Sequence, residues 1–458
     1  MIDLSTKPLP QNLEAEQAVL GAVLIEGNAI NQVLEIVARD DFYKDSHRKI
    51  FDAMIELDRV GKPIDILTLF DYLKSRGQLL EEVGGSGYLT YLTEVVPSTV
   101  NVEYYARLVK EKAILRKLVI TATDIAKGGF QDGVDVDDFL SRAEQSIFNI
   151  GEHKVKPSFY ETRELAAKAL EIIETLHEKK ELITGVPTGF EKLDHMTSGL
   201  QPSDLIIVAA RPGLGKTSFC LNIATHASLE HGAPVGIFSL EMSKEQLMLR
   251  MLSSEAKVNY SHIRSGFIRN EDLEKLVKAA DKYRRAKLYI DDTPAIGILE
   301  LRAKTRRCKR EKGLELIIVD YLQLMRGTGG RTETREREIA EISASLKALA
   351  KELEMPVIAV SQLSRQTEAR ADRRPQLSDL RESGALEQDA DVVIFIHRAD
   401  AYRTKPEDKE KKDGIAEIIV GKQRNGPTGT VKLAFLSEKI GVPSFENLTE
   451  EYEEMEVF

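Results

Sequence analysis

The sequence contains only two cysteines, Cys220 and Cys308, and they lie far apart in the chain. A zinc site built from several cysteines is therefore excluded, and a structural disulfide is not expected. There is no run of about 18 or more apolar residues, which argues against a membrane-spanning helix. The first 17 residues lack the basic start and apolar core of a secretory signal. Together these absences predict a protein of the reducing cytoplasm.

Net charge also argues, at first, against a nucleic-acid partner. The chain of 458 residues has a formal net charge of −10. The charge is uneven, however: residues 1–152 carry 16 Lys and Arg against 25 Asp and Glu, and residues 446–458 carry six Glu and no Lys or Arg. The middle of the chain is consequently mildly basic. That leaves room for a local track of phosphate contacts, although ordinary solvated charge explains it equally well.

Length and hydrophobic periodicity divide the chain into four segments. Residues 1–152 predict an all-helical N-terminal domain, interrupted at 61–63 and 84–87 and ending with a helix over about 136–148. Residues 153–183 predict a linker with a helix from 161 to about 179. That helix either packs on its own domain or docks on a neighbouring subunit. Residues 184–445 predict an α/β domain, and residues 446–458 an acidic tail.

The α/β prediction comes from short apolar runs that alternate with helical stretches. Several runs are continuous and rich in Val and Ile, as expected for strands buried on both faces of a sheet. We expect a mainly parallel sheet with helices on both faces. The expected strands are 205–210, 235–240, 288–290, 316–320, 357–361, 392–396, 415–420 and 431–436, and the helices between them include 216–231, 271–285 and 336–353.

The strongest motif is LIIVAARPGLGKTS at residues 205–218. A buried strand enters a glycine-containing loop, and a helix opens at Gly-Lys-Thr, which is the setting of a phosphate-binding loop for ATP. Lys216 is expected to neutralise the β- and γ-phosphates, and Thr217 to bind Mg²⁺. Ala210 replaces the first glycine of the general pattern. The expected nucleotide-binding residues are Arg211, Pro212, Gly213, Leu214, Gly215, Lys216, Thr217 and Ser218.

Three polar residues follow the ends of other expected strands. Asp320 ends the run at 316–320, where a carboxylate can hold the metal, although a helix-capping role is the alternative. Glu241 follows the run at 235–240, where it can polarise the attacking water or simply start a helix. Gln362 follows the run at 357–361, where it can touch the γ-phosphate or serve as a structural amide.

Three loops, at residues 325–331, 365–374 and 381–384, are basic or glycine-rich, which suits phosphate contact without base recognition. They are represented by Arg331, Arg365 and Arg381. Aromatic residues are absent from these loops, so base stacking is not expected to contribute much. Residues 302–312 are densely basic but helical. For them a solvated face, a subunit contact and DNA binding remain open.

These residues resemble the bacterial replicative DNA helicases of the DnaB family. The resemblance covers nearly the whole chain in order, and the Ala210 variant of the phosphate loop is itself typical of the family. It reaches the N-terminal domain through PQNLEAE at 10–16 and through Asp41, Phe42, His47, Ile50 and Phe51. The matching segments of the α/β domain are FSLEM (238–242), IIVDYLQL (317–324), SQLSR (361–365), LRESGALEQDAD (380–391) and GKQRNGP (421–427).

The resemblance implies a homohexameric ring of RecA-like domains, with ATP bound between protomers. It implies that Glu241 is the catalytic carboxylate, that Asp320 is the acidic metal-binding residue, and that Gln362 couples the γ-phosphate to the DNA loops. Lys422 and Arg424 would reach the site of the next subunit, unless they are plain surface charge. A pore loop with Arg381, Glu382 and Gly384 would contact single-stranded DNA.

The resemblance further implies 5′→3′ translocation on single-stranded DNA, unwinding of forked DNA at the replication fork, and primase and a helicase loader as partners. Two alternatives remain open from the residues alone. A recombinase or clock-type ATPase would share the phosphate loop but not the helical N-terminal domain. A slowly hydrolysing scaffold or loader would need neither Glu241 nor a cation supplied by a neighbour.

Overall fold

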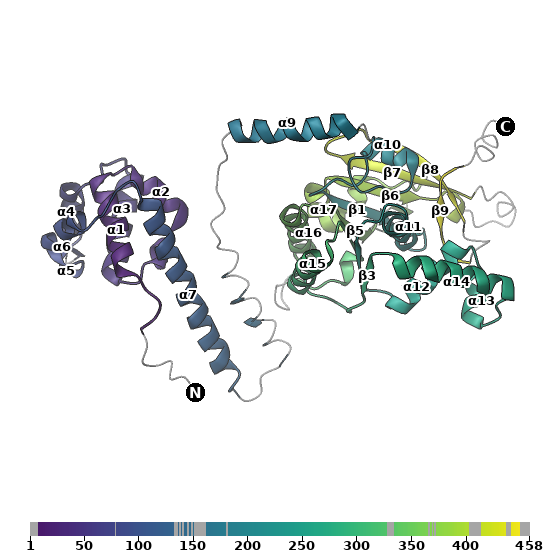
Figure 1. Cartoon of the computed structure of the whole chain (residues 1–458), viewed down its shortest axis with the longest axis horizontal. Helices are drawn as coiled ribbons and strands as arrows, with labels where there is room; N and C mark the ends of the chain where they lie inside the picture. The colour runs from purple at the N-terminus through teal and green to yellow at the C-terminus, as the bar shows by residue number, and fades with distance from the viewer. Residues whose placement is uncertain are drawn as a thin grey trace. The chain divides into compact units, whose positions relative to one another are not determined.

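In a computed structural model, the chain divides into two compact units, Met1–Ala169 and Leu170–Phe458 (Figure 1). Within the described ranges, no helix is both long and apolar enough to cross a bilayer. Cys220 and Cys308 are both free thiols. The structure describes residues 8–77, 79–131, 162–179, 182–327, 334–364, 372–402, 414–436 and 441–448, and also 136, 139, 142–143, 146–147, 150, 367–368 and 370.

The N-terminal unit is helical, as the sequence predicts. Its apolar positions recur at helical spacing and converge on one core, in which Phe42, Phe51 and Leu69 are fully buried. Asn12 and Asp65 cap two of the helices by accepting backbone N–H groups. The helices are α1 (Leu13–Ile25), α2 (Ala29–Ile36), α3 (Asp45–Arg59), α4 (Ile66–Ser75), α5 (Leu79–Glu82), α6 (Gly85–Glu94) and α7 (Val102–Gly128), with a 3₁₀ turn at Arg39–Asp41.

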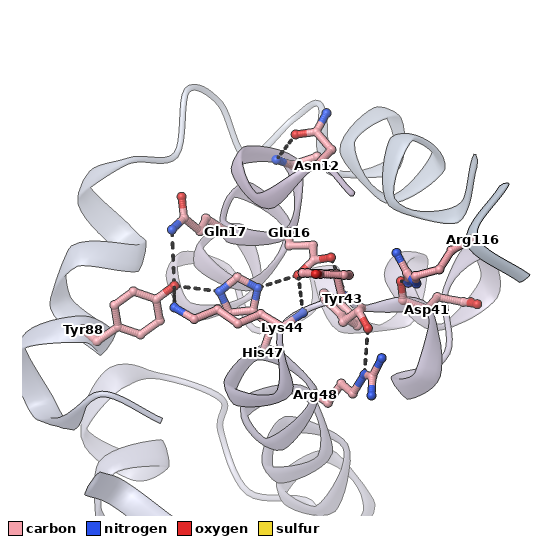
Figure 2. A network of polar contacts seen from close by, with 12 residues as sticks. Asn12, Glu16, Gln17, Asp41, Tyr43, Lys44, His47, Arg48, Tyr88 and Arg116 are labelled. Carbon is pink, nitrogen blue, oxygen red and sulfur yellow. Dashed lines mark hydrogen bonds and ion pairs between the residues drawn. The ribbon is translucent and has the colours of Figure 1, made fainter. Parts of the chain in front are cut away.

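A buried polar chain joins α1, α3 and α6 (Figure 2). Nδ1 of His47 lies 2.6 Å from a carboxylate oxygen of Glu16, and Nε2 lies 2.6 Å from the hydroxyl of Tyr88. The Tyr88 oxygen also accepts from the side chains of Gln17 and Lys44, so its own hydrogen is left for His47. Each member therefore has a partner, as burial of polar groups demands.

The expected helix at 136–148 lies largely outside the described residues. The linker helix is present as α9 (Thr162–Lys179), close to its predicted bounds. Three of its apolar side chains, Leu165, Leu170 and Ile173, are about half exposed. Their exposure leaves an apolar face on α9 without a covering element among the residues that the structure describes.

The α/β unit contains a nine-stranded sheet in the order β3-β2-β4-β5-β1-β6-β7-β8-β9. Neighbours from β3 to β6 pair in parallel, and β6 to β9 pair antiparallel, so the sheet is mainly parallel as expected. The strands are β1 (Leu205–Ala210), β2 (Val235–Ser239), β3 (Leu288–Asp291), β4 (Leu316–Asp320), β5 (Val357–Gln362), β6 (Val392–His397), β7 (Ile415–Gln423), β8 (Gly429–Phe435) and β9 (Phe445–Glu446).

Strand β9 is absent from the predicted strands, because a strand of two residues is too short to show periodicity. Glu446, assigned above to the acidic tail, instead pairs with Ala434 of β8. The next residue, Asn447, accepts a hydrogen bond from the N–H of Glu191 and donates one to the carbonyl of Gly189. These contacts attach the segment to the domain, and the remainder of the predicted tail after 448 lies outside the described residues.

Alternate residues of β1 pack into different cores, which shows that both faces of the sheet are covered (Figure 1). Ile206, Val208 and Ala210 join the core beneath α11, α12 and α14, whereas the intervening residues join the core beneath α15, α16 and α17. The helices of this unit are α10 (Glu191–Thr197), α11 (Lys216–Leu229), α12 (Lys244–Ala256), α13 (Tyr260–Ser265), α14 (Asn270–Arg285), α15 (Ile298–Lys312), α16 (Arg335–Leu353) and α17 (Gly384–Asp389), with 3₁₀ turns η3 (Leu322–Leu324), η5 (Leu377–Ser383) and η6 (Asp400–Tyr402).

Candidate active site

The carboxyl ends of β2, β4, β5 and β1 lie side by side at one edge of the sheet. In the strand register, Ser239 at the end of β2 pairs with Asp320 at the end of β4. Likewise, Ala210 at the end of β1 pairs with Gln362 at the end of β5. This edge is where parallel α/β sheets bind ligands. It brings together the phosphate loop and the three polar residues predicted from strand ends.

The phosphate loop connects β1 directly to α11, which begins at Lys216. Gly213 and Gly215 both have positive φ, +79° and +99°, a conformation that favours glycine. A Cβ on Gly215 would lie 2.9 Å from Cζ of Phe445, so this glycine also permits a close approach of β9. The loop therefore presents the N-terminus of α11, with its free N–H groups, as an anion site.

The ammonium group of Lys216 is folded back on the loop. Its Nζ donates to the carbonyl oxygens of Ala210 at 3.0 Å and Arg211 at 3.4 Å. Burial lowers the pKa of Lys216, while the carboxylates of Asp320 and Glu241 oppose that shift. A buried ammonium is stabilised by nearby negative charge, and the phosphates of a bound triphosphate would supply that charge. The position of Lys216 is therefore compatible with the role expected for it.

Thr217 and Asp320 form the part of the site that suits Mg²⁺. The Thr217 hydroxyl donates to Oδ2 of Asp320 at 2.6 Å. Burial raises the pKa of Asp320, and the nearby negative charge of Glu241 raises it further. Hydroxyl and carboxylate oxygens are the ligands that Mg²⁺ prefers, and a cation here would relieve the crowding of negative charge. The two residues thus fit the metal predicted from the sequence.

Glu241 and Gln362 are both exposed at this edge. Glu241 follows Leu240, whose N–H donates to the carbonyl of Asp320 at 2.7 Å and extends the β2–β4 pairing beyond the strand. Gln362 is the last residue of β5, whose other residues are buried. Both positions leave the polar head groups accessible to a nucleotide and to water.

Arg211, one of the expected nucleotide-binding residues, uses its side chain for contacts within the chain. Its guanidinium is buried and donates to the carbonyl of Leu363 at 2.8 Å and to the carboxylate of Glu368 at 2.7 Å. The side chain therefore ties the loop to the segment after β5. Glu368 was not singled out in the sequence, because its partner lies 157 residues away.

Arg250 is a second residue that the sequence analysis missed. Its Nε is buried and has no hydrogen-bond partner among the described residues. It helps to line a cavity of about 230 Å³ beside α11, and its charge acts on Asp320. Nothing in the spacing of α12 distinguishes Arg250 from a surface arginine. Other residues lining the cavity include Ser218, Asn222, Tyr283, Ser444 and Phe445.

Lys422 and Arg424 lie at the opposite edge of the same sheet. The backbone N–H of Arg424 donates to the carbonyl of Asp391 at 3.0 Å, and the carboxylate of Asp391 accepts the N–H of Leu205 at 2.8 Å. Leu205 is the first residue of β1, whereas the phosphate loop follows the last. Since six strand residues span roughly 16 Å, Arg424 cannot reach the phosphate loop of its own chain.

The predicted DNA-binding residues are described only in part. Arg331 and Arg365 lie outside the described residues, and only the backbone of Arg381 and Glu382 is described, within η5. Gly384 is exposed at the start of α17.

Other arginines from these basic segments are engaged within the chain. Arg370 pairs with Asp379, and Arg374 with Glu417. The basic helix α15 is partly explained in the same way, since two of its arginines pair with Glu352 of α16.

The chain matches two family models: the DnaB-like helicase C-terminal domain over residues 185–444 and the DnaB-like helicase N-terminal domain over residues 8–111. It is 49% identical to the replicative DNA helicase DnaC of Bacillus subtilis, with 96% of each chain covered. It is 48% identical to the replicative DNA helicase DnaB of Geobacillus stearothermophilus, covering 98% of this chain and 97% of that one.

Solved structures agree with these matches. A DnaB-like replicative helicase studied for its interactions with primase aligns with a TM-score of 0.72 and 34% identity, covering 96% of this chain and all of the other. A second solved structure, of an isolated ATPase domain, aligns with a TM-score of 0.58 and 38% identity over 62% of this chain and 99% of that one. The similarity spans both units, which the recombinase and scaffold alternatives do not explain. The chain therefore belongs to the family of DnaB-like replicative helicases, which are ATP-dependent DNA helicases.

Proposed function

We propose that this helicase works as a homohexameric ring in which each ATP, with Mg²⁺, is bound between two protomers. One protomer supplies the phosphate loop, Glu241, Asp320 and Gln362, and the next supplies Lys422 and Arg424. Hydrolysis drives 5′→3′ movement along single-stranded DNA in the pore and the parting of forked DNA.

The observation that carries this proposal is the position of the two sets of residues at opposite edges of one sheet. The fold keeps Arg424 away from the phosphate loop of its own chain, and this separation supports a site completed by Arg424 of a second copy. In a head-to-tail arrangement of copies, the edge of the sheet that carries Lys422 and Arg424 in one copy faces the edge that carries the phosphate loop in the next. Repetition of this contact closes a ring. Each chain then both gives and receives a cation.

Exposed apolar faces support assembly. On α14, Leu273 and Val277 are four residues apart, share one face of the helix and are half exposed. Near them in sequence, Phe267 is 83% exposed. The apolar face of α9 is a candidate partner for this surface on a neighbouring protomer. That would make α9 a docking helix rather than a surface helix of its own domain.

The chemistry follows from the charges at the site. In phosphoryl transfer, negative charge spreads over the γ-phosphoryl oxygens, and Lys216 together with Arg424 of the next protomer would stabilise it. Glu241 orients the attacking water and accepts its proton. Mg²⁺, when bound, neutralises phosphate charge, and Thr217 and Asp320 are the residues that would hold it. A cationic side chain supplied in this way by a neighbouring protomer raises the rate of hydrolysis by a factor of about 10³–10⁵.

Coupling to DNA has a short physical route. Two residues after Gln362, the N–H of Ser364 donates to the carbonyl of Asp379 at 3.1 Å. Asp379 lies in η5, which carries Arg381. A shift of Gln362 on loss of the γ-phosphate would therefore move the backbone that carries the pore loop. We propose that Arg381, Glu382 and Gly384 contact the DNA backbone there, with Arg365 and Arg331 as further contacts.

Mixed subunits test the shared site. Arg424→Ala protein and Glu241→Ala protein are each expected to be inactive as ATPases. Mixed rings contain interfaces with an intact Glu241 on one side and an intact Arg424 on the other, so hydrolysis should recover. The Glu241→Ala/Arg424→Ala double variant mixed with Glu241→Ala is the control, since no interface then contains Glu241. Absence of recovery at every mixing ratio would rule out the shared site.

Primase and a helicase loader are proposed as partners, on the strength of the solved relative studied with primase and of the family resemblance. We expect the protein in the bacterial cytoplasm at the replication fork, because its relatives are bacterial replicative helicases. The partnership with primase is tested by co-purification: primase should co-purify with the full-length protein and should be lost when residues 1–111 are removed.

A further inference from the structure

Lys422 and Arg424 do not extend freely into solvent; they are held by the end of α17. Nζ of Lys422 donates to the carbonyl oxygens of Glu387 at 2.5 Å and Ala390 at 2.7 Å. Nη2 of Arg424 donates to the carbonyl of Gln388 at 2.9 Å. The last carbonyls of a helix have no partner within it, so cations satisfy them well.

Asp391 completes this holding site. Its carboxylate lies 3.4 Å from Nη1 of Arg424 and is only 6% exposed. The same carboxylate accepts the N–H of Leu205 at 2.8 Å and pairs with the ammonium of Lys347 on α16. Arg424, by contrast, is about half exposed and makes the longest of these contacts. Arg424 can therefore leave while Asp391 keeps Lys347 and Leu205 as partners.

The other end of α17 begins at Gly384, immediately after η5 and its candidate DNA-binding residues. The carbonyls that hold the two cations thus lie only three to six positions after Gly384. Because the hydrogen-bonded turns of α17 move together, contacts made by its last carbonyls affect the position of its first residue, Gly384.

We propose that Asp391 and the carbonyl oxygens of Glu387, Gln388 and Ala390 form a dock that competes with the neighbour's triphosphate for Lys422 and Arg424. While the neighbouring site lacks a γ-phosphate, the cations rest in the dock and fix α17. When they move to the nucleotide, the end of α17 is released and the loop at Gly384 gains freedom to shift. Asp391 is thus a positioning residue that acts through Arg424. This inference rests on the proposed function.

Asp391→Asn tests the dock in the full-length assembled protein. The amide keeps an oxygen for the Leu205 N–H but removes the charge that attracts Arg424. Binding of a non-hydrolysable ATP analogue with Mg²⁺ should tighten about two- to fivefold, as expected for loss of a half-exposed competing ion pair. Stimulation of hydrolysis by single-stranded DNA should fall by a similar factor. In an Arg424→Ala background, the same change should leave analogue affinity unaltered.

Glu352→Gln is the matched control, because Glu352 pairs with two arginines of α15 and not with the dock. It should leave analogue affinity unchanged. If assembled Asp391→Asn protein binds the analogue no more tightly than the unmodified protein, the dock is overturned. It is also overturned if Asp391→Asn tightens analogue binding by the same factor in the Arg424→Ala background. If mixed subunits recover activity and Asp391→Asn has no effect, the dock alone fails; if mixing fails, the shared site fails.

A second measurement does not depend on the folding of Asp391→Asn. In the unmodified protein, amide hydrogen exchange over residues 384–391 should speed up when the analogue binds. In Lys422→Ala protein, it should be fast with and without the analogue, because the dock has already lost a donor. Unchanged or slower exchange of this segment in the unmodified protein on analogue binding contradicts the proposal.

Discussion

The hydroxyl of Thr217 donates a 2.6 Å hydrogen bond to the carboxylate of Asp320, across 103 residues of sequence. Thr217 lies in the first turn of α11 and Asp320 ends β4, so this bond joins the helix after the phosphate loop to the end of another strand. It leaves hydroxyl and carboxylate oxygens together in a buried setting where the pKa of Asp320 is raised by desolvation.

Thr217→Ala should reduce ATP hydrolysis about a hundredfold or more and increase the Mg²⁺ concentration needed for half-maximal rate, because it removes an oxygen ligand. Thr217→Ser keeps the hydroxyl and should retain most of the activity. A titration of rate against Mg²⁺ compares the two. Equal behaviour of the two variants would show that the hydroxyl has no role in metal binding.

Lys216→Ala should abolish hydrolysis and unwinding, because it removes the ammonium that neutralises the β- and γ-phosphates. Steady-state ATPase and forked-DNA unwinding assays measure the loss. Lys275→Ala is a suitable control: Lys275 is an exposed lysine of α14 that pairs only with Asp272 on the same helix in the part of the chain described. Substantial turnover by Lys216→Ala would refute the assigned loop.

Gly215→Ala should destabilise the α/β unit by about 1–3 kcal/mol, since an alanine there combines a strained φ with a clash against Phe445. Gly213→Ala has a similar φ but no heavy atom within 4 Å of the added Cβ, so it should cost about 1 kcal/mol. Urea denaturation in the absence of nucleotide compares them. Equal losses would mean that the contact with β9 is unimportant.

Stability should depend on pH through Asp204, whose pKa is raised to about 6 by burial and by the charge of Asp391. A carboxyl with a raised folded pKa binds its proton more tightly when folded, so its ionisation destabilises the fold above pH 6. Asp204→Asn should therefore be more stable than the unmodified protein at pH 8, by up to about 2 kcal/mol. The difference should shrink between pH 6 and pH 4. A difference independent of pH would refute the assignment.

His47→Ala should destabilise the N-terminal unit by about 3 kcal/mol, because it leaves the buried Glu16 carboxylate without its main side-chain partner. Tyr88→Phe removes only the outer member of the chain and should cost about 1 kcal/mol. Calorimetric unfolding distinguishes the two. The reverse order of losses would indicate that Tyr88, not His47, holds Glu16 in place.

Local features of the α/β domain were predictable from sequence. Strands β1 and β4 begin and end where expected, because a strand buried on both faces is a continuous apolar run with polar residues at its ends. The phosphate loop was predictable for the same reason: Gly215 and Lys216 sit at a junction of strand and helix whose signal is contained in adjacent residues. The carboxyl ends of the strands in a parallel sheet lie at one edge, so the position of Asp320 beside the phosphate loop was also predictable from the sequence.

Only the tertiary structure decided what depends on distant segments. The direction of the chain reverses between β6 and β7, which places Arg424 beside the start of β1 rather than beside the phosphate loop. The side chain of Arg211 pairs with Glu368, 157 residues away, and β9 adds a strand too short to recognise from the sequence. Strand direction, register and side-chain partners depend on pairing energies between residues far apart in the chain, and no local pattern records them.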